Sequence, residues 1–221
     1  MFENISNKSI KVKFLAKDFM LKNRLEKLEY SSFHEFSNKN FLIPNQTHST
    51  NVTYSNIPGQ IDNCDGVFTS NPKIVCCIKV ADCMPIFFAH HSLIFYGVVH
   101  AGWKGLIEGI LKETSVLIEK KGHKLNDFDI LIGPSIQKCC FEISNDIVSR
   151  FPSEHIKPKP SGKFMIDLQD IAFQELKDNG FNKNKIRISN DCSYCQKDKY
   201  FSFRRNGKNA GRMIGLIGFR P

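Results

Sequence analysis

The chain has 221 residues, of which 41% are hydrophobic and 24% charged, and its formal net charge is +9. This composition excludes a disordered or collagen-like chain and is typical of a folded globular protein. The lysines are spread along the chain without a block of five or six, so the charge does not indicate nucleic-acid binding, although it favours small anions.

The beginning of the chain carries charges and asparagines where a secretory signal needs an apolar run, and no apolar stretch is long enough to predict a membrane-spanning helix. We therefore expect a cytoplasmic protein without membrane contacts. Its eight cysteines should then be mostly thiols. The length fits a single domain over residues 1–221, and nothing indicates the oligomeric state.

Short strands are predicted along much of the chain, because runs rich in β-forming residues are bounded by turn residues. Two of the runs, residues 74–80 and 93–99, are mainly apolar and predict buried neighbouring strands. Each leads into a polar segment. The remaining predicted strands are residues 9–15, 40–43, 51–54, 128–132, 185–188 and 212–219.

Apolar residues at helical spacing predict two helices, over residues 106–121 and from Leu168 to Gly180. Asp167 is placed to cap the second helix, and Glu175 is the polar member of its apolar face. Residues 151–162, rich in proline and charge, predict a surface loop. This mixture of elements favours a mixed α/β (α+β) domain with a large β component.

Three segments each place one good zinc ligand beside turn-forming residues: PNQTHS contains His48, VADCMP contains Cys83 and VHAGWKG contains His100. Zinc in catalytic sites typically takes three protein ligands and keeps a fourth position open, and imidazole and thiolate are both good donors. The spacing matches no local metal motif. From the residues alone, a buried thiol, a loop histidine and a hydrogen-bonded core histidine remain the alternative.

The segments QTHSTNV, CDGVFTS, VADCMPIFF, HAGWKGLIEGI, IGPSIQKCCFEI and YFSFRRNGKNAGR resemble successive blocks of the YfiH/YlmD family, also described as multicopper-polyphenol-oxidase-like or laccase-domain proteins. They occur in family order over nearly the whole chain. The resemblance implies a single YfiH-like domain with layered mixed β-sheets flanked by helices. It also implies zinc on His48, Cys83 and His100, with copper as the alternative metal.

The resemblance further implies a purine nucleoside phosphorylase that acts on adenosine, inosine and methylthioadenosine, with adenosine deaminase activity. Its partners would be a nucleoside and phosphate. The family usually has Arg where this chain has Lys104, and Lys lacks the planar fork that grips phosphate in a bidentate way. The basic candidates for phosphate binding are Lys104, Arg204, Arg205 and Arg212.

Two aspartates lie close to the expected ligands in sequence. Asp82, which precedes Cys83, is the catalytic candidate that could orient a zinc ligand or exchange a proton with the purine. Asp65, which precedes Gly66, could do the same, although an Asp-Gly pair is more often a turn former.

The remaining cysteines give a further candidate. Cys140 could be a nucleophile or approach the metal, and no disulfide to Cys139 is expected because adjacent side chains on a strand point apart. Cys192 and Cys195 have CxxC spacing, but no second CxxC exists to complete a four-cysteine metal site. We therefore predict that this second pair consists of free thiols.

Three other functions stay open beside the phosphorylase. A copper-dependent phenol oxidase would explain the laccase description, but seven histidines are too few for a multi-copper centre. A cysteine-type amide hydrolase acting on cell-wall precursors would use Cys83 or Cys140 as its nucleophile. The net positive charge leaves a basic RNA-binding module as the third alternative.

Overall fold

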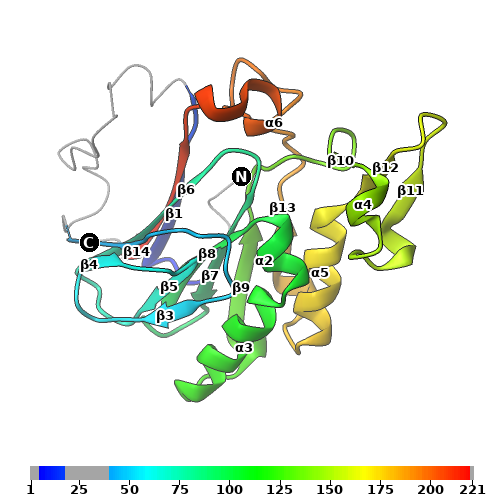
Figure 1. Cartoon of the computed structure of the whole chain (residues 1–221). Coiled ribbons are helices and arrows are strands. Elements are labelled where there is room, and N and C mark those ends of the chain that lie inside the picture. Colours follow the sequence, from blue (N-terminus) through cyan, green and yellow to red (C-terminus); the bar gives the residue numbers. More distant parts are fainter. Residues whose placement is uncertain (1–4, 18–39, 220–221) are drawn as a thin grey trace.

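Two β-sheets packed face to face form the frame of the computed structural model, which describes residues 5–17 and 40–219 (Figure 1). The five-stranded sheet contains, in spatial order, β1 (Ile10–Leu15), β14 (Met213–Phe219), β6 (Ile74–Val80), β2 (Asn40–Pro44) and β4 (Gly59–Ile61). The six-stranded sheet contains β13 (Ile186–Ile188), β9 (Phe128–Ile132), β7 (Met84–His90), β8 (Tyr96–Ala101), β5 (Gly66–Thr69) and β3 (Val52–Tyr54).

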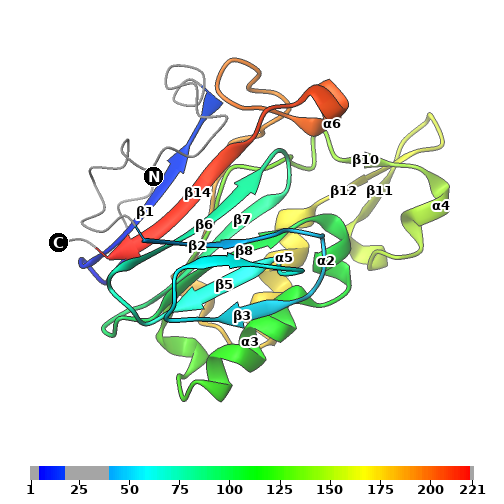
Figure 2. The same ribbon diagram turned by 60° about the vertical axis from the view of Figure 1, so that its left-hand side comes forward.

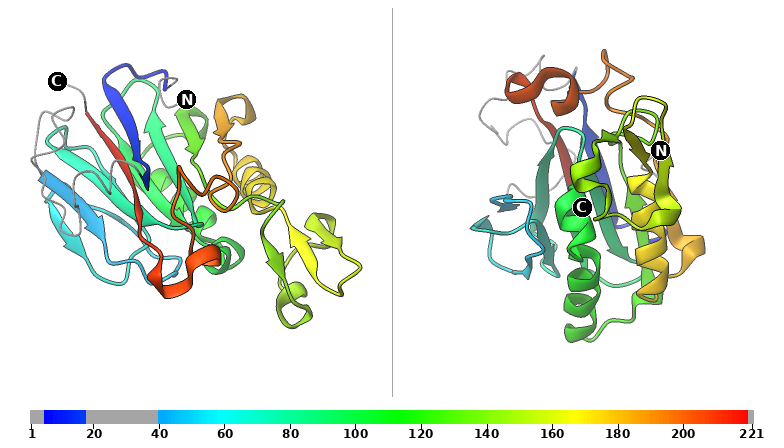
Figure 3. Two further views of the ribbon diagram at one scale, coloured as in Figure 1. Left: turned by 90° about the horizontal axis from the view of Figure 1, so that it is seen from above. Right: turned by 45° about the vertical axis from the view of Figure 1, so that its right-hand side comes forward.

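A third, smaller sheet stands out from the other two (Figure 3). Its strands are β10 (Glu142–Ile143), β12 (Phe164–Ile166) and β11 (Ile156–Pro158). The α-helices are α2 (Trp103–Ile107), α3 (Ile110–Lys120), α4 (Asn145–Val148), α5 (Leu168–Asp178) and α6 (Phe203–Asn206). Short 3₁₀ segments cover Leu125–Asp127, Ser153–His155, Lys183–Lys185 and Gly207–Asn209. The mixed α/β class expected from the sequence is confirmed.

Both faces of the six-stranded sheet are buried, which is why its central strands are mainly apolar. In β7, Ile86 and Phe88 pack in the cluster that contains the helices, whereas Phe87 and Ala89 pack against the five-stranded sheet. Phe87 approaches β14 closely, because a Cβ built on Gly215 would lie 2.9 Å from its ring. The main core therefore has two layers, one on each side of this sheet.

The expectation that residues 74–80 and 93–99 form neighbouring strands is wrong. β6 lies in the five-stranded sheet beside β14, and β8 lies in the six-stranded sheet between β7 and β5 (Figure 2). Their side chains meet across the space between the sheets, where Ile78 and Val98 share one apolar cluster. β6 is buried as expected apart from Lys79, and β8 is buried throughout but begins at Tyr96, so Leu93 and Ile94 of the predicted run are exposed. Burial does not say in which sheet a strand pairs.

The helices follow the sequence pattern with one break. The helix predicted over 106–121 is divided into α2 and α3 at Gly109, whose φ of 97° is left-handed and favours glycine. α5 begins after Asp167, which accepts a hydrogen bond from the backbone N–H of Asp170 at 3.2 Å. Among residues 5–17 and 40–219, no helix has the length and apolar character needed to cross a membrane.

The loop predicted over residues 151–162 is partly a strand. Ile156–Pro158 forms β11 at the edge of the small sheet, paired antiparallel with β12. Proline is tolerated there because an edge strand need not use every N–H in a ladder.

Glu175 provides a test of the α5 packing, because it lies on a helix that buries Leu168, Ile171, Ala172 and Leu176. Burial raises the pKa of its carboxyl from 4.5 to about 7. The ionised form therefore lowers the stability above pH 7, and this loss disappears as the pH falls toward the unfolded-state pKa. We expect Glu175→Gln to increase the free energy of unfolding by about 1 kcal/mol at pH 8 and much less at pH 5.

Urea unfolding at both pH values measures this difference. Glu119→Gln, the same change at an exposed position on α3, serves as the control and should change little. An equal effect of the two substitutions at pH 8 would contradict the assignment of a costly buried charge to Glu175.

Candidate metal site

Strand register brings the site residues together at one end of the six-stranded sheet. His100 lies near the end of β8, opposite Pro85 of β7, so Cys83 lies in the turn just before β7 begins. On the other side of β8, Asp65 directly precedes β5, and its carbonyl accepts the N–H of His100 at 2.7 Å. His48 comes from the loop between β2 and β3. Three of these residues were predicted as metal ligands.

The three predicted ligands meet in space. One ligand atom each from His48, Cys83 and His100 lies within 4.8 Å of the other two. The Cys83 sulfur is 3.9 Å from Nε2 of His48, and the two imidazole rings meet edge to face with centroids 4.8 Å apart. These separations suit one metal ion bound by two nitrogens and one sulfur.

Backbone conformation is unusual on both sides of this cluster. His48 and Asp82 have positive φ angles of 61° and 85°, which non-glycine residues seldom adopt. A Cβ at Gly102 would lie 2.9 Å from Cδ2 of His48 and 3.2 Å from the Cys83 sulfur. The main chain at position 102 therefore lies so close to His48 and Cys83 that a side chain at this position would collide with them.

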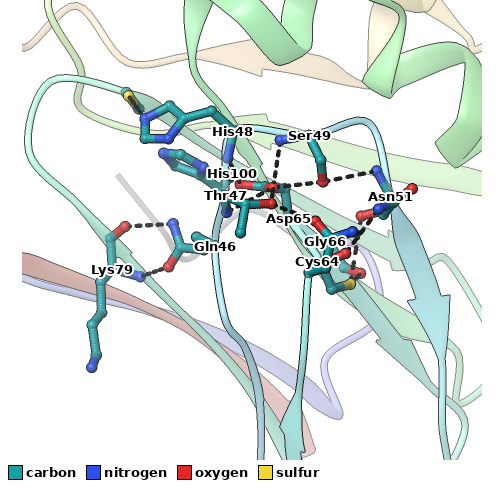
Figure 4. Close-up of polar contacts among 12 residues, drawn as sticks. Gln46, Thr47, His48, Ser49, Asn51, Cys64, Asp65, Gly66, Lys79 and His100 are labelled. Atoms are coloured by element: carbon teal, nitrogen blue, oxygen red, sulfur yellow. Dashed lines mark hydrogen bonds and ion pairs between the residues drawn. The ribbon is translucent and has the colours of Figure 1, made fainter.

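Asp65 supports two of the three candidate ligands (Figure 4). Its Oδ1 lies 2.7 Å from Nδ1 of His100 and accepts the backbone N–H of His48 at 3.1 Å. Its Oδ2 accepts the N–H and the hydroxyl of Ser49 at 2.7 and 2.8 Å. Because Nδ1 of His100 is engaged, that ring presents Nε2 to a metal. A carboxylate behind a histidine is the usual support of a zinc-bound imidazole.

The loop that carries His48 is also fastened to the other sheet (Figure 4). The side-chain amide of Gln46 donates to the carbonyl of Lys79 at 2.8 Å and accepts the Lys79 N–H at 2.9 Å. Two hydrogen bonds to one residue of β6 fix both the position and the direction of the loop. Contacts with β6, through Gln46, and with Asp65 therefore hold the loop of His48 in place from two sides.

The charges in the cluster favour the thiolate form of Cys83 and the protonated form of His100. Burial raises the pKa of the Cys83 thiol, but His100 and His48 outweigh this effect and lower the pKa to about 6. Burial lowers the pKa of His100, but Cys83 and Asp65 raise it above its ordinary value. For Asp65, hydrogen bonds from His100 and Ser49 overcome the effect of burial and hold the pKa well below its usual range. These shifts favour a thiolate at Cys83 near neutral pH, and a metal ion that bound His100 would displace a proton.

Asp82, predicted to orient a ligand or to exchange a proton, makes its contacts elsewhere. Its buried carboxylate accepts hydrogen bonds from the hydroxyls of Ser193 and Ser202 at 2.6 and 2.9 Å and from the N–H of Arg204 at 2.6 Å. These bonds attach the turn of Cys83 to the turn that follows β13 and to the start of α6. The contact with a candidate ligand belongs to Asp65, the second candidate from the sequence.

A cavity of about 1280 Å³ opens beside the three candidate ligands. Its wall combines cationic and aromatic side chains, so it offers contacts both to an anion and to a flat ring. The cationic and aromatic residues of the wall include Lys79, Lys104, Lys163, Arg204, Arg212, Trp103, Phe141 and Phe203.

Two predicted site residues do not line this cavity. The Arg205 guanidinium donates to the backbone carbonyls of Ser193, Tyr194 and Tyr200 at 3.1, 2.7 and 2.7 Å. The sulfur of Cys140 lies 3.2 Å from that of Cys195. Among the basic candidates for phosphate binding, the cavity is lined by Arg204, one position earlier in α6, and by Lys104 and Arg212.

Replacing Asp65 by Asn tests its support of the ligands. Asn keeps the size of the side chain but removes the charge beside His100. We therefore expect Asp65→Asn to weaken Zn²⁺ binding by about 10- to 100-fold, measured by competition with a chromophoric chelator. Asp62→Asn, the same change at an exposed position nearby, is the control. Unchanged affinity in Asp65→Asn would remove this residue from the supporting role.

Comparison with known proteins gives a consistent result. The family model described as multi-copper polyphenol oxidoreductase laccase matches residues 20–220. A purine nucleoside phosphorylase of Haemophilus influenzae is 35% identical over 182 residues, which cover 79% of this chain and 72% of that protein. One from Clostridium acetobutylicum is 30% identical over 178 residues, or 78% of this chain and 74% of that protein.

Solved structures agree with the fold. YlmD from Geobacillus stearothermophilus has a TM-score of 0.78 at 26% identity, covering 82% of this chain and 74% of that one. YfiH from Bacillus licheniformis, at 24% identity, has a TM-score of 0.77 and covers 81% of this chain and 74% of that one, which supports the fold alone. The chain therefore belongs to the family of YfiH and YlmD, described as multi-copper polyphenol oxidoreductase laccase.

Proposed function

We propose that this protein is a zinc-dependent purine nucleoside phosphorylase that acts on adenosine, inosine and methylthioadenosine and also deaminates adenosine. The observation that carries the proposal is the cluster of His48, Cys83 and His100 beside a cavity with cationic and aromatic walls. The names of the relatives support it, since those from Haemophilus influenzae and Clostridium acetobutylicum are both called purine nucleoside phosphorylases.

The donor set favours zinc. Two imidazoles and one thiolate are ligands that zinc accepts readily, and three protein ligands leave a position for water or substrate. When bound, the metal would supply a Lewis acid at the edge of the cavity. Asp65 holds the His100 ring in the orientation that presents Nε2, and Gly102 leaves room for the ligands to approach.

Phosphorolysis requires a site for an anion. An oxygen of phosphate forms a bond to C1′ of the ribose, the bond from C1′ to the purine nitrogen breaks, and the departing purine takes up a proton. Lys104, Arg204 and Arg212 line the cavity and supply the positive charge that holds phosphate. One Nη of Arg204 donates to the carbonyl of Glu142 at 2.8 Å, and a guanidinium has five donors, so the same side chain can bind both groups.

The aromatic side chains of the cavity can hold the purine. Phe203 lies at the wall with half of its surface exposed, although a large apolar side chain is usually buried. A flat base that stacks on such a ring covers apolar area and gains offset-stacking contacts. We therefore assign Phe203, together with Trp103 and Phe141 of the same wall, to the base rather than to the phosphate.

The direct test is turnover by the purified protein. Incubation with adenosine and phosphate should yield adenine and ribose-1-phosphate, and deamination should yield inosine, all separated by chromatography. A chelator should abolish both reactions and zinc should restore them. The proposal fails if the zinc-loaded protein does not turn over nucleosides, or if it oxidises a phenol instead.

A substitution of Lys104 should affect phosphorolysis but not deamination, because deamination uses water in place of phosphate. Loss of one charged hydrogen bond of about 1.5 kcal/mol should raise the KM for phosphate about tenfold in Lys104→Ala. Adenosine deamination should stay within about twofold of the unchanged protein. Lys112→Ala, with the same change of charge at an exposed position of α3, is the control. An equal decrease of both reactions would exclude a phosphate-specific role for Lys104.

A further inference from the structure

Four cysteines from two distant turns converge next to the cavity wall. Cys139 and Cys140 belong to the turn that precedes β10, and Cys192 and Cys195 belong to the turn that follows β13. We propose that these cysteines form a second metal site, a tetrathiolate site for Zn²⁺ that joins the two turns. The proposal stands apart from the reaction, since none of the four lines the cavity.

The distances between the sulfurs fit a metal site. All four lie within 4.8 Å of one another, with 3.2 Å between Cys140 and Cys195 and 3.7 Å between Cys139 and Cys195. Four sulfurs at about 2.3 Å from a tetrahedral Zn²⁺ lie about 3.8 Å apart. A disulfide requires a separation of about 2.05 Å. Four sulfurs that approach one common point, rather than forming two pairs, correspond to the geometry of a single ion.

The local backbone explains how adjacent cysteines can act together. Residues 137–140 form a turn, in which the N–H groups of Cys140 and Phe141 both donate to the carbonyl of Gln137 at 2.9 Å. On a strand, Cys139 and Cys140 would point to opposite faces. In the turn, both sulfurs reach Cys195. The adjacent pair therefore supplies what a second CxxC would supply elsewhere.

Backbone contacts keep the two turns side by side. Ser135 and Cys192 form an isolated parallel bridge, and the N–H of Ser193 donates to the carbonyl of Ser135 at 3.0 Å. The turns are thus arranged for ligation by contacts that do not depend on the metal.

The composition of the site points to zinc. Thiolates are soft ligands, and four of them in a compact tetrahedral arrangement are typical of structural zinc sites. Such sites have no open position, so their role is to hold segments together.

The segments joined here carry part of the cavity wall. Phe141 and Glu142 follow the first turn directly and line the cavity. Arg204 donates to the carbonyl of Glu142, and Arg205 donates to the carbonyls of Ser193 and Tyr194 in the second turn. The second ion would therefore fix the wall that bears Arg204, without taking part in the reaction.

Metal content tests the proposal. Protein prepared under reducing conditions with zinc should hold about two zinc ions per chain, measured by mass spectrometry of the metal. Cys195→Ser should hold about one, whereas Cys195→His, which keeps a good zinc ligand, should hold about two. Cys195 is exposed, so neither change disturbs the core. Cys83→Ser should lose the other ion and keep the tetrathiolate site.

Cobalt substitution identifies which site is lost. A tetrathiolate site gives intense visible absorption with Co²⁺, so these bands should persist in Cys83→Ser and disappear in Cys195→Ser. Circular dichroism of each variant checks that the fold is retained, and Cys139→Ser repeats the test at a second exposed ligand. One zinc per chain in the unchanged protein, with these bands missing, overturns the proposal. So does a disulfide between Cys140 and Cys195 in the reduced preparation.

Discussion

The buried carboxylate of Asp65 is the interaction on which the candidate site depends. A carboxylate taken out of water must be hydrogen-bonded, and this one is bonded by His100, by the loop of His48 and by Ser49. Each bond also positions the group that donates it. The requirement that Asp65 be satisfied thus sets the loop conformation, the ring orientation of His100 and the charge of the cluster together.

The sheets supply the frame in which that carboxylate can be buried. β5, β8 and β7 are neighbouring strands, and their register places Asp65, His100 and Cys83 at the same end of the sheet. Because apolar layers cover both faces of these strands, the polar residues are confined to the strand ends and the turns. The cavity lies at that same end, where chemistry can be added without interrupting the core.

Much of this arrangement could be predicted from the sequence, and the rest depends on contacts that a sequence pattern does not contain. Several strands, the two longer helices and the cap at Asp167 follow from local composition, whereas β5 and β7 were not predicted. The three candidate ligands come from the resemblance, and the structure brings them together, although their binding of a metal stays a prediction. The assignment of β6 and β8 to different sheets, by contrast, depends on which strands they pair with. Apolar runs look the same in either sheet.

The misplaced side chains have similar causes. Asp65 and Asp82 both precede turn residues, and only the strand register shows that Asp65 faces His100. Which of the adjacent Arg204 and Arg205 lines the cavity depends on the direction of a single helical turn. The cysteine cluster was missed because Cys139 and Cys140 were considered as neighbours on a strand, where adjacent side chains point apart, and because no second CxxC was present; in the turn both sulfurs reach Cys195.

The position of β14 has a consequence for how the protein is made on the ribosome. β14 pairs with β1 on one side and with β6 on the other, so the five-stranded sheet lacks an interior strand until residues 213–219 have been made. The groups that bind Asp82 also come well after it, since Arg204 follows it by 122 residues. A nascent chain can pair β7 with β8 early, but the turn of Cys83 is not held in place until Arg204 has emerged.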